Sequence, residues 1–191
     1  MKWIRAENTH KPLFPSDVVK FCSDCILPMI NSNHLSVRTE HRRYGQDGSK
    51  FIFRASPCYH HDGGQDSSVW YDWAVFDVDE SPIPCQILCF VRIDSLKPDC
   101  QHFVRSYPVT ENCNYAVVRR MVSPPSAIGG SEFVKSGILA NDLYLFDCET
   151  IKSEIAVVHD DNSDNDVHNR FMVVSNRINW LKCFDEIIDS Y

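Results

Sequence analysis

The feature that most constrains the fold is a succession of short segments rich in β-branched and aromatic residues, separated by Pro, Gly, Asp and Asn. The alternating helices that a parallel sheet requires are missing between them. The pattern therefore predicts a mainly β (α+β) protein whose antiparallel sheet closes or folds into a barrel. The expected strands are 35–44, 50–55, 69–78, 83–93, 115–122, 142–147, 153–159 and 170–175, with 56–68 as a loop.

Helical periodicity marks the two ends of the chain. An apolar series with Ser16 as N-cap and Pro28 as terminator predicts a short helix over 17–27. Apolar residues at helical spacing in 179–191 predict a closing helix that packs on the domain. The expected organisation is an N-terminal helical lead-in, 1–33, followed by a β-barrel domain with its closing helix, 34–191.

Length and charge bound the classes of function. A chain of 191 residues with 43% hydrophobic and 24% charged residues is long and apolar enough for one packed domain. The formal net charge of −7 argues against binding naked nucleic acid, which needs a concentrated basic surface, and favours a basic protein or peptide partner. The pairs Arg42-Arg43 and Arg119-Arg120 are short enough to be solvated strand faces.

Cysteine usage points to a reducing compartment. The nine cysteines are an odd number, several stand within apolar runs, and the sequence has no Asn-x-Ser/Thr sequon. Residues 1–9 lack the apolar core of a secretory signal, and no stretch approaches the roughly 20 apolar residues of a membrane span. We therefore expect an intracellular protein without a membrane partner.

The order of several phrases resembles a known type of domain. An aromatic-Asp-Trp strand is followed by an apolar Ile-Leu strand, a Tyr-Ala-Val-Val strand and a terminal Trp. The succession is similar to the carboxy-terminal β-rich region of transposase-like proteins of large CACTA-type DNA transposons, and it also looks like a bromo-adjacent-homology (BAH) module. The phrases are RTEHRRYG (38–45), FRASPCYHHDGG (53–64), VWYDWAVFDV (69–78), CQILCFVRI (85–93), YAVVRRM (115–121) and RFMVVSNRINW (170–180).

The resemblance implies an SH3/BAH-like elaborated β-barrel that docks a protein partner. By analogy with BAH modules, that partner would be a histone tail or another chromatin protein, and the location would be the nucleus. The chain carries none of the catalytic region of a transposase, so the resemblance implies a non-enzymatic module derived from a mobile element.

The expected ligand site lies on the strand 69–78. Trp70, Tyr71, Asp72 and Trp73 bring three aromatic rings together with a carboxylate, the composition of a cation–π box for a methylated lysine. The alternative is that Trp73 and Val75 belong to the core, since aromatic residues in strands mostly serve packing. We expect the four residues 70–73 to be the ligand-binding set.

Two metal-dependent alternatives have weaker support. Cys22 and Cys25 with Cys58 and either His60 or His61 could supply four zinc ligands. Cys22 and Cys25 also share one face of the expected helix, which is ordinary core placement.

Asp77 and Asp79, with Asp164, resemble the carboxylates of a Mg²⁺-dependent nuclease, but the α/β alternation of such an enzyme is missing. The preferred interpretation has no catalytic residue, no metal and no cofactor, and a purely structural domain is a further alternative.

Overall fold

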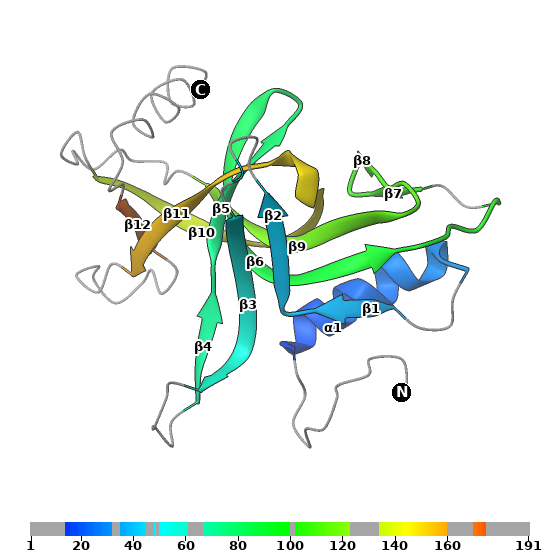
Figure 1. Ribbon diagram of the computed structural model, residues 1–191, viewed down its shortest axis with the longest axis horizontal. Helices are drawn as coiled ribbons and strands as arrows, with labels where there is room; N and C mark the ends of the chain where they lie inside the picture. Colours follow the sequence, from blue (N-terminus) through cyan, green and yellow to red (C-terminus); the bar gives the residue numbers. More distant parts are fainter. Residues whose placement is uncertain are drawn as a thin grey trace. The chain divides into compact units, whose positions relative to one another are not determined.

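The computed structural model describes residues 14–31, 35–44, 48, 50–60, 67–99, 102–122, 134–159 and 170–174. Over these residues the protein is mainly β, with antiparallel sheets and one α-helix close to the N-terminus (Figure 1). The mainly β class and the antiparallel pairing expected from the succession of β-rich segments are therefore confirmed, whereas closure of the sheet into a barrel stays a prediction. The expected closing helix, 179–191, lies outside the described residues.

The strands form three sheets. The largest has the order β1-β6-β5-β11-β12-β10-β9 with a further β6–β9 pairing, and the smaller ones are β2-β3-β4 and β7-β8. The strands are β1 (Ser36–Arg38), β2 (Glu40–Tyr44), β3 (Lys50–His60), β4 (Ser67–Tyr71), β5 (Trp73–Val78), β6 (Ser81–Ile93), β7 (Phe103–Val104), β8 (Tyr107–Pro108), β9 (Cys113–Val122), β10 (Val134–Asp147), β11 (Ile151–His159) and β12 (Arg170–Val174).

The chain divides into two compact units, and the long strands β6, β9 and β10 contribute residues to both. Unit 1 comprises Met1–Asp72, Ile87–Val118 and Leu143–Glu149. Unit 2 comprises Trp73–Gln86, Arg119–Asp142 and Thr150–Tyr191. Each unit has its own cluster of buried apolar side chains.

The N-terminal helical segment has three turns of different geometry. The α-helix α1 (Ser16–Phe21) continues as the π-helix η1 (Cys22–Ile26) and the 3₁₀ turn η2 (Leu27–Met29). The predicted helix is confirmed, but the assignment of Ser16 as N-cap is wrong. Pro15 occupies the cap position without a side-chain hydrogen bond, and its carbonyl accepts from Val19 N at 3.0 Å.

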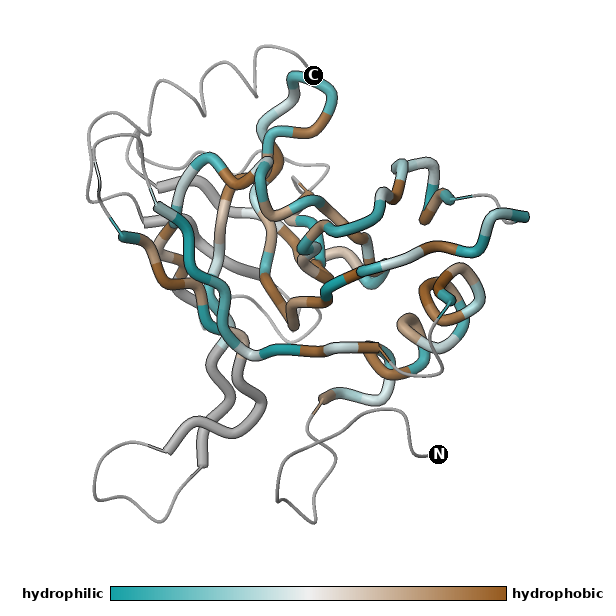
Figure 2. Tube along the Cα trace, turned by 45° about the vertical axis from the view of Figure 1, so that its right-hand side comes forward, coloured by the Kyte–Doolittle hydropathy of each residue, from teal (hydrophilic) through white to brown (hydrophobic). Residues whose placement is uncertain are grey.

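The core of unit 1 lies between this helical segment and three strands. Val18, Phe21 and Ile26 are buried in one cluster with residues of β6, β9 and β10, and apolar residues alternate with polar ones along the helical coil (Figure 2). The two faces of β6 are both covered over Ile87–Val91, which explains its nearly continuous apolar sequence. On the face opposite the helix, the ring of Phe90 lies 5.4 Å from His41 of β2.

The region predicted as strand 35–44 is two strands that belong to different sheets. A bend at Thr39 separates β1, which pairs with β6, from β2, which pairs with β3. The predicted loop 56–68 is wrong at its two ends, because 56–60 extends β3 and 67–68 begins β4. The turn-forming residues Pro57, Gly63 and Gly64 misled the prediction, since local composition does not reveal cross-strand pairing.

Unit 2 is built around the β5–β6 hairpin and β11. Strand β5 pairs with β6 on one side and with β11 on the other. The hairpin turns through two residues, Asp79 and Glu80, whose φ angles of 51° and 64° lie in the left-handed region. Such a turn normally favours glycine or asparagine, so these two positions are strained. Buried apolar side chains beside the hairpin complete the unit: Trp73, Val75, Met121, Leu139 and Ile155.

A close approach at Gly137 gives the first test of this packing. A Cβ atom on Gly137 would lie 2.7 Å from Met121 Sδ and 3.2 Å from the Val122 carbonyl oxygen, too close for an unstrained side chain. We expect Gly137→Ala to lower the free energy of unfolding by about 1–3 kcal/mol in chemical denaturation. In the presence of Met121→Ala, Gly137→Ala should lower the free energy of unfolding by less than it does in the wild-type protein. Strict additivity of the two substitutions would contradict the predicted clash.

Candidate functional site

The predicted ligand residues lie where one strand ends and the next begins. Asp72 interrupts the run between β4 and β5, and it is hydrogen-bonded to Arg54 and Ile87. Its Oδ2 accepts from Arg54 N at 2.5 Å, its own N donates to Arg54 O at 2.8 Å, and its carbonyl accepts from Ile87 N at 2.9 Å. Asp72 therefore fixes the backbone of unit 1 at this point, whatever ligand role it has.

The aromatic residues of this segment have different surroundings. Trp73 is 7% exposed and packs with Val75 in the core of unit 2, as the packing alternative considered from the sequence requires. Tyr71 is half-buried against the core cluster of unit 1. The backbone of Trp70, in β4, pairs with that of Ser56, in β3. The side chain of Trp70 lies outside the described part of the structure. Ligand binding by the set 70–73 stays a prediction, and Trp73 is the member whose packing role is visible.

The described acidic residues of the nuclease alternative have different surroundings. Asp77 Oδ2 lies 2.8 Å from Lys152 Nζ in an ion pair, whereas Asp79 is exposed at the tip of the β5–β6 turn. Among the described residues, no group of three or more His, Cys, Asp or Glu side chains could hold a metal ion. Asp164 lies outside them.

The cysteines of the zinc alternative serve packing where they are described. Cys22 is buried in the core of unit 1, and Cys25 is partly buried on the next turn. Burial raises the pKa of the Cys25 thiol, which keeps it protonated and weakens it as a metal ligand. The side chains of Cys58, His60 and His61 lie outside the described set. Among the described residues, six cysteines are free thiols: Cys22, Cys25, Cys85, Cys89, Cys113 and Cys148.

A cluster of aromatic rings in unit 1 was not predicted. Tyr144 and Phe146 lie on the face of β10 opposite Leu143 and Leu145, which belong to the core. The ring centroid of Tyr107, from β8, lies 4.9 Å from that of Phe146 with an interplanar angle of 84°, and 6.3 Å from that of Tyr144. We call Tyr107, Tyr144 and Phe146 the aromatic platform.

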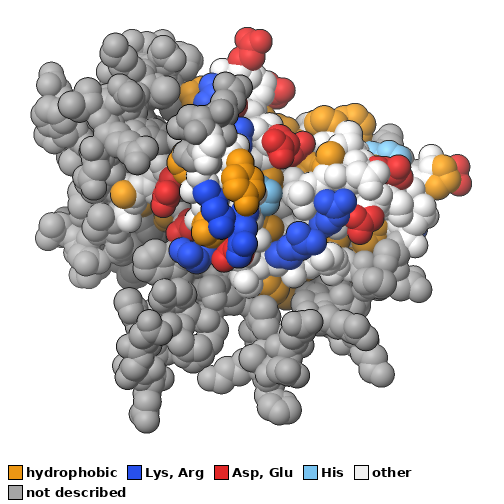
Figure 3. Space-filling view, viewed as in Figure 1, with side chains coloured by type: hydrophobic (Ala, Val, Ile, Leu, Met, Phe, Trp, Pro, Cys, Tyr) orange, Lys and Arg blue, Asp and Glu red, His pale blue; other side chains and the backbone are white. Residues whose placement is uncertain are grey.

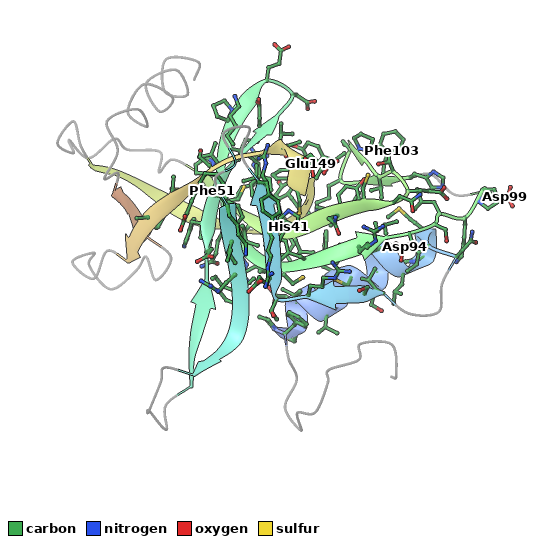
Figure 4. The ribbon with its side chains drawn as sticks, in the orientation of Figure 1. His41, Phe51, Asp94, Asp99, Phe103 and Glu149 are labelled. Atoms are coloured by element: carbon green, nitrogen blue, oxygen red, sulfur yellow. The ribbon has the colours of Figure 1, made fainter. Side chains whose placement is uncertain are left out.

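A cation already occupies the aromatic platform. The guanidinium carbon of Arg105 lies 5.4 Å from the centroid of the Tyr144 ring, within cation–π range. Arg105 and Ser106 form the two-residue turn between β7 and β8, with φ angles of 49° and 74°. Exposed Phe103 lies on the same hairpin (Figure 4). The strained turn therefore presents Arg105 to the ring; in the sequence, the only available signal was the short Phe-Val-Arg-Ser-Tyr-Pro run.

Lysine and arginine side chains gather on a second surface of unit 1. Figure 3 shows blue side chains over the area in which Figure 1 draws β2 and β3. Three of them have acidic partners: Arg42 Nε lies 2.7 Å and Arg54 Nε 3.9 Å from Glu40, and Arg92 bonds Asp94 at 2.7 Å. We call these cationic residues of β1, β2, β3 and β6 the basic face: Arg38, Arg42, Lys50, Arg54 and Arg92.

His41 lies beneath the basic face, on the inner side of β2, and Figure 4 shows it together with Glu149 from η3 (Cys148–Thr150). Partial burial lowers the pKa of the His41 imidazole below its ordinary value. The carboxylates of Glu149 and Asp147 oppose this shift, and the guanidinium groups of Arg43 and Arg38 reinforce it. The lowered pKa favours the neutral form of the ring, which lies tilted at 31° to the ring of Phe90.

Comparison with known proteins identifies no relative: no family model, no curated protein and no solved structure matches the chain. Within the described residues, no helix is long and apolar enough to cross a membrane.

The burial of Trp73 predicts a structural phenotype. Trp73→Ala removes a large side chain from the core of unit 2, and we expect it to lower the free energy of unfolding by about 3–5 kcal/mol in urea denaturation. Tyr44→Ala is the matched control, because Tyr44 is 67% exposed and should change stability by less than about 0.5 kcal/mol. Equal stability of the two variants would contradict the assignment of Trp73 to the core.

The environment of His41 predicts how stability depends on pH. Since the folded-state pKa lies below the unfolded value of about 6.5, the unfolded chain binds the proton more readily, and stability falls as the pH decreases through 6.5. We expect His41→Gln to reduce the slope of unfolding free energy against pH between 7.5 and 5. Parallel curves for the two proteins, measured by urea denaturation at several pH values, would contradict the prediction.

Proposed function

We propose that the protein is a non-enzymatic protein-interaction module that binds a basic peptide segment, such as a histone tail, in the nucleus. In this proposal the fold is a BAH-like elaborated β-barrel associated with a mobile element, as the sequence resemblance implies. What supports this part of the proposal is the mainly β architecture, with antiparallel sheets, of the described residues.

The observation that carries the proposal is the guanidinium of Arg105 over the ring of Tyr144. Tyr107 packs edge-on against Phe146 beside it, so two half-buried tyrosines form a rigid, preorganised surface that already stabilises one cation. A lysine or arginine of a partner peptide could take the place of Arg105. Arg105 is exposed on a strained two-residue turn, which makes its displacement less costly than that of a buried group.

Binding of a labelled peptide tests the proposal. We expect Tyr144→Ala to weaken binding of an arginine- and lysine-rich histone-tail peptide by about tenfold, which lies within the range of one cation–π contact. Arg105→Gln should strengthen binding, because it removes the competing internal cation. Fluorescence anisotropy measures each affinity, and thermal unfolding verifies that each variant is folded.

Two controls separate this site from the one predicted at 70–73. Tyr44→Ala removes an exposed tyrosine elsewhere in unit 1 and should leave the affinity unchanged. Trp70→Ala should weaken binding if the segment 70–73 supplies the pocket. Loss of affinity in Trp70→Ala alone would move the site to β4, and absence of binding by the wild-type protein would favour the purely structural alternative.

A further inference from the structure

One edge of strand β2 is not paired with any described strand. Strand β2 is the terminal strand of the β2-β3-β4 sheet, and its register pairs Arg42 with Ile52 and Tyr44 with Lys50. Ala55 N donates to Thr39 O at 2.8 Å, which makes Thr39 and Ala55 a hydrogen-bonded pair. Because such pairs alternate along an antiparallel ladder, the N–H and C=O groups of Arg42 and Tyr44 point away from β3. Within the described chain, no backbone group bonds them.

The side chains at this edge are mostly cationic. Arg42 and Lys50 lie on the outer face of the β2–β3 pair together with Tyr44, since directly paired residues share a face. Arg43 lies on the inner face but is only half-buried. Arg38 and Lys50 of the basic face, like Arg43, make no ion pair with any described residue, so the described acidic groups of unit 1 do not fully neutralise the basic face.

From these two features we propose that β2 binds an acidic peptide segment of another protein as an added β-strand. The backbone groups of Arg42 and Tyr44 would bond the incoming strand, which lies about 4.8 Å from β2 in a regular sheet. Carboxylates on successive residues of that strand would lie beside Arg42 on one face and Arg43 on the other. The exposed ring of Tyr44 offers an apolar contact for a residue further along.

The edge favours an acidic peptide over a nucleic acid. A phosphate backbone would use the cationic side chains but leave the β2 backbone groups unbonded, and it would meet Glu40 on the same outer face. The chain as a whole carries a charge of −7 and repels acidic ligands in general. An acidic peptide is therefore attracted only where it lies along the basic face. This surface is separate from the aromatic platform, and the proposal does not depend on the proposed function.

An amide NMR titration of the full-length, isotope-labelled chain tests the inference. The probe is a ten-residue peptide in which single valines alternate with pairs of glutamates. The control peptide replaces each glutamate with glutamine. We expect shifts confined to β2 and β3, centred on Arg42 and Tyr44, and an affinity that falls steeply between 50 and 200 mM salt. The glutamine peptide should bind at least about tenfold more weakly.

Two substitutions at one position separate the backbone contribution from the charge. Arg42→Gln keeps the edge N–H and removes the charge, whereas Arg42→Pro removes both without breaking a β2–β3 hydrogen bond. We expect Arg42→Gln to weaken binding several-fold and Arg42→Pro to weaken it several-fold more, with thermal unfolding verifying the fold. Equal affinities of the two variants would overturn strand addition, since charge alone would then explain binding.

A single-stranded oligonucleotide supplies the remaining comparison. Binding of a twelve-residue oligothymidylate with the same shifts and an affinity equal to that of the acidic peptide would overturn the proposal and assign the basic face to nucleic acid. Shifts confined to Tyr107 and Tyr144 would also overturn it, because the peptide would then occupy the aromatic platform.

Discussion

Coverage of β6 on both faces is the constraint on which unit 1 depends. One face packs against the helical segment through Val18, Phe21 and Ile26, and Phe90 on the other face lies against His41. A strand that is apolar on both sides must be covered twice, or it exposes a surface that drives aggregation. The bend at Thr39 meets this need, because it lets β1 extend the sheet while β2 crosses over its face.

That arrangement also decides which surfaces remain for partners. Because the inner side of the β2–β3 pair is used to cover β6, its outer side and the edge of β2 stay exposed and carry Arg42, Tyr44 and Lys50. The two faces of strand β10 also have different roles, since Leu145 lies in the core and Tyr144 lies on the opposite face under Arg105. In both places a packing requirement on one face of a strand leaves the other face to present charged or aromatic groups.

The sequence predicted the elements better than their partners. Strands such as 83–93 and 115–122 were predicted close to their observed bounds, because β-branched and aromatic residues mark them locally. The candidate site was harder to predict. The three aromatic residues among the four positions 70–73 predicted a ligand site by their composition. Trp73 is nevertheless buried among residues that are distant in the sequence, Leu139 and Ile155. The aromatic platform joins Tyr107 to Tyr144 across 37 residues, a proximity that no local pattern could reveal.

Local patterns of periodicity, turn residues and apolar content were enough to predict the mainly β class and the N-terminal helix, because these patterns act over a few neighbouring positions. The tertiary structure alone decided the sheet order, the split of 35–44 between two sheets and the gathering of the basic face in a chain of charge −7. These features depend on which strands pair. Pairing is chosen by long-range burial and register, and the same local sequence is compatible with several such choices.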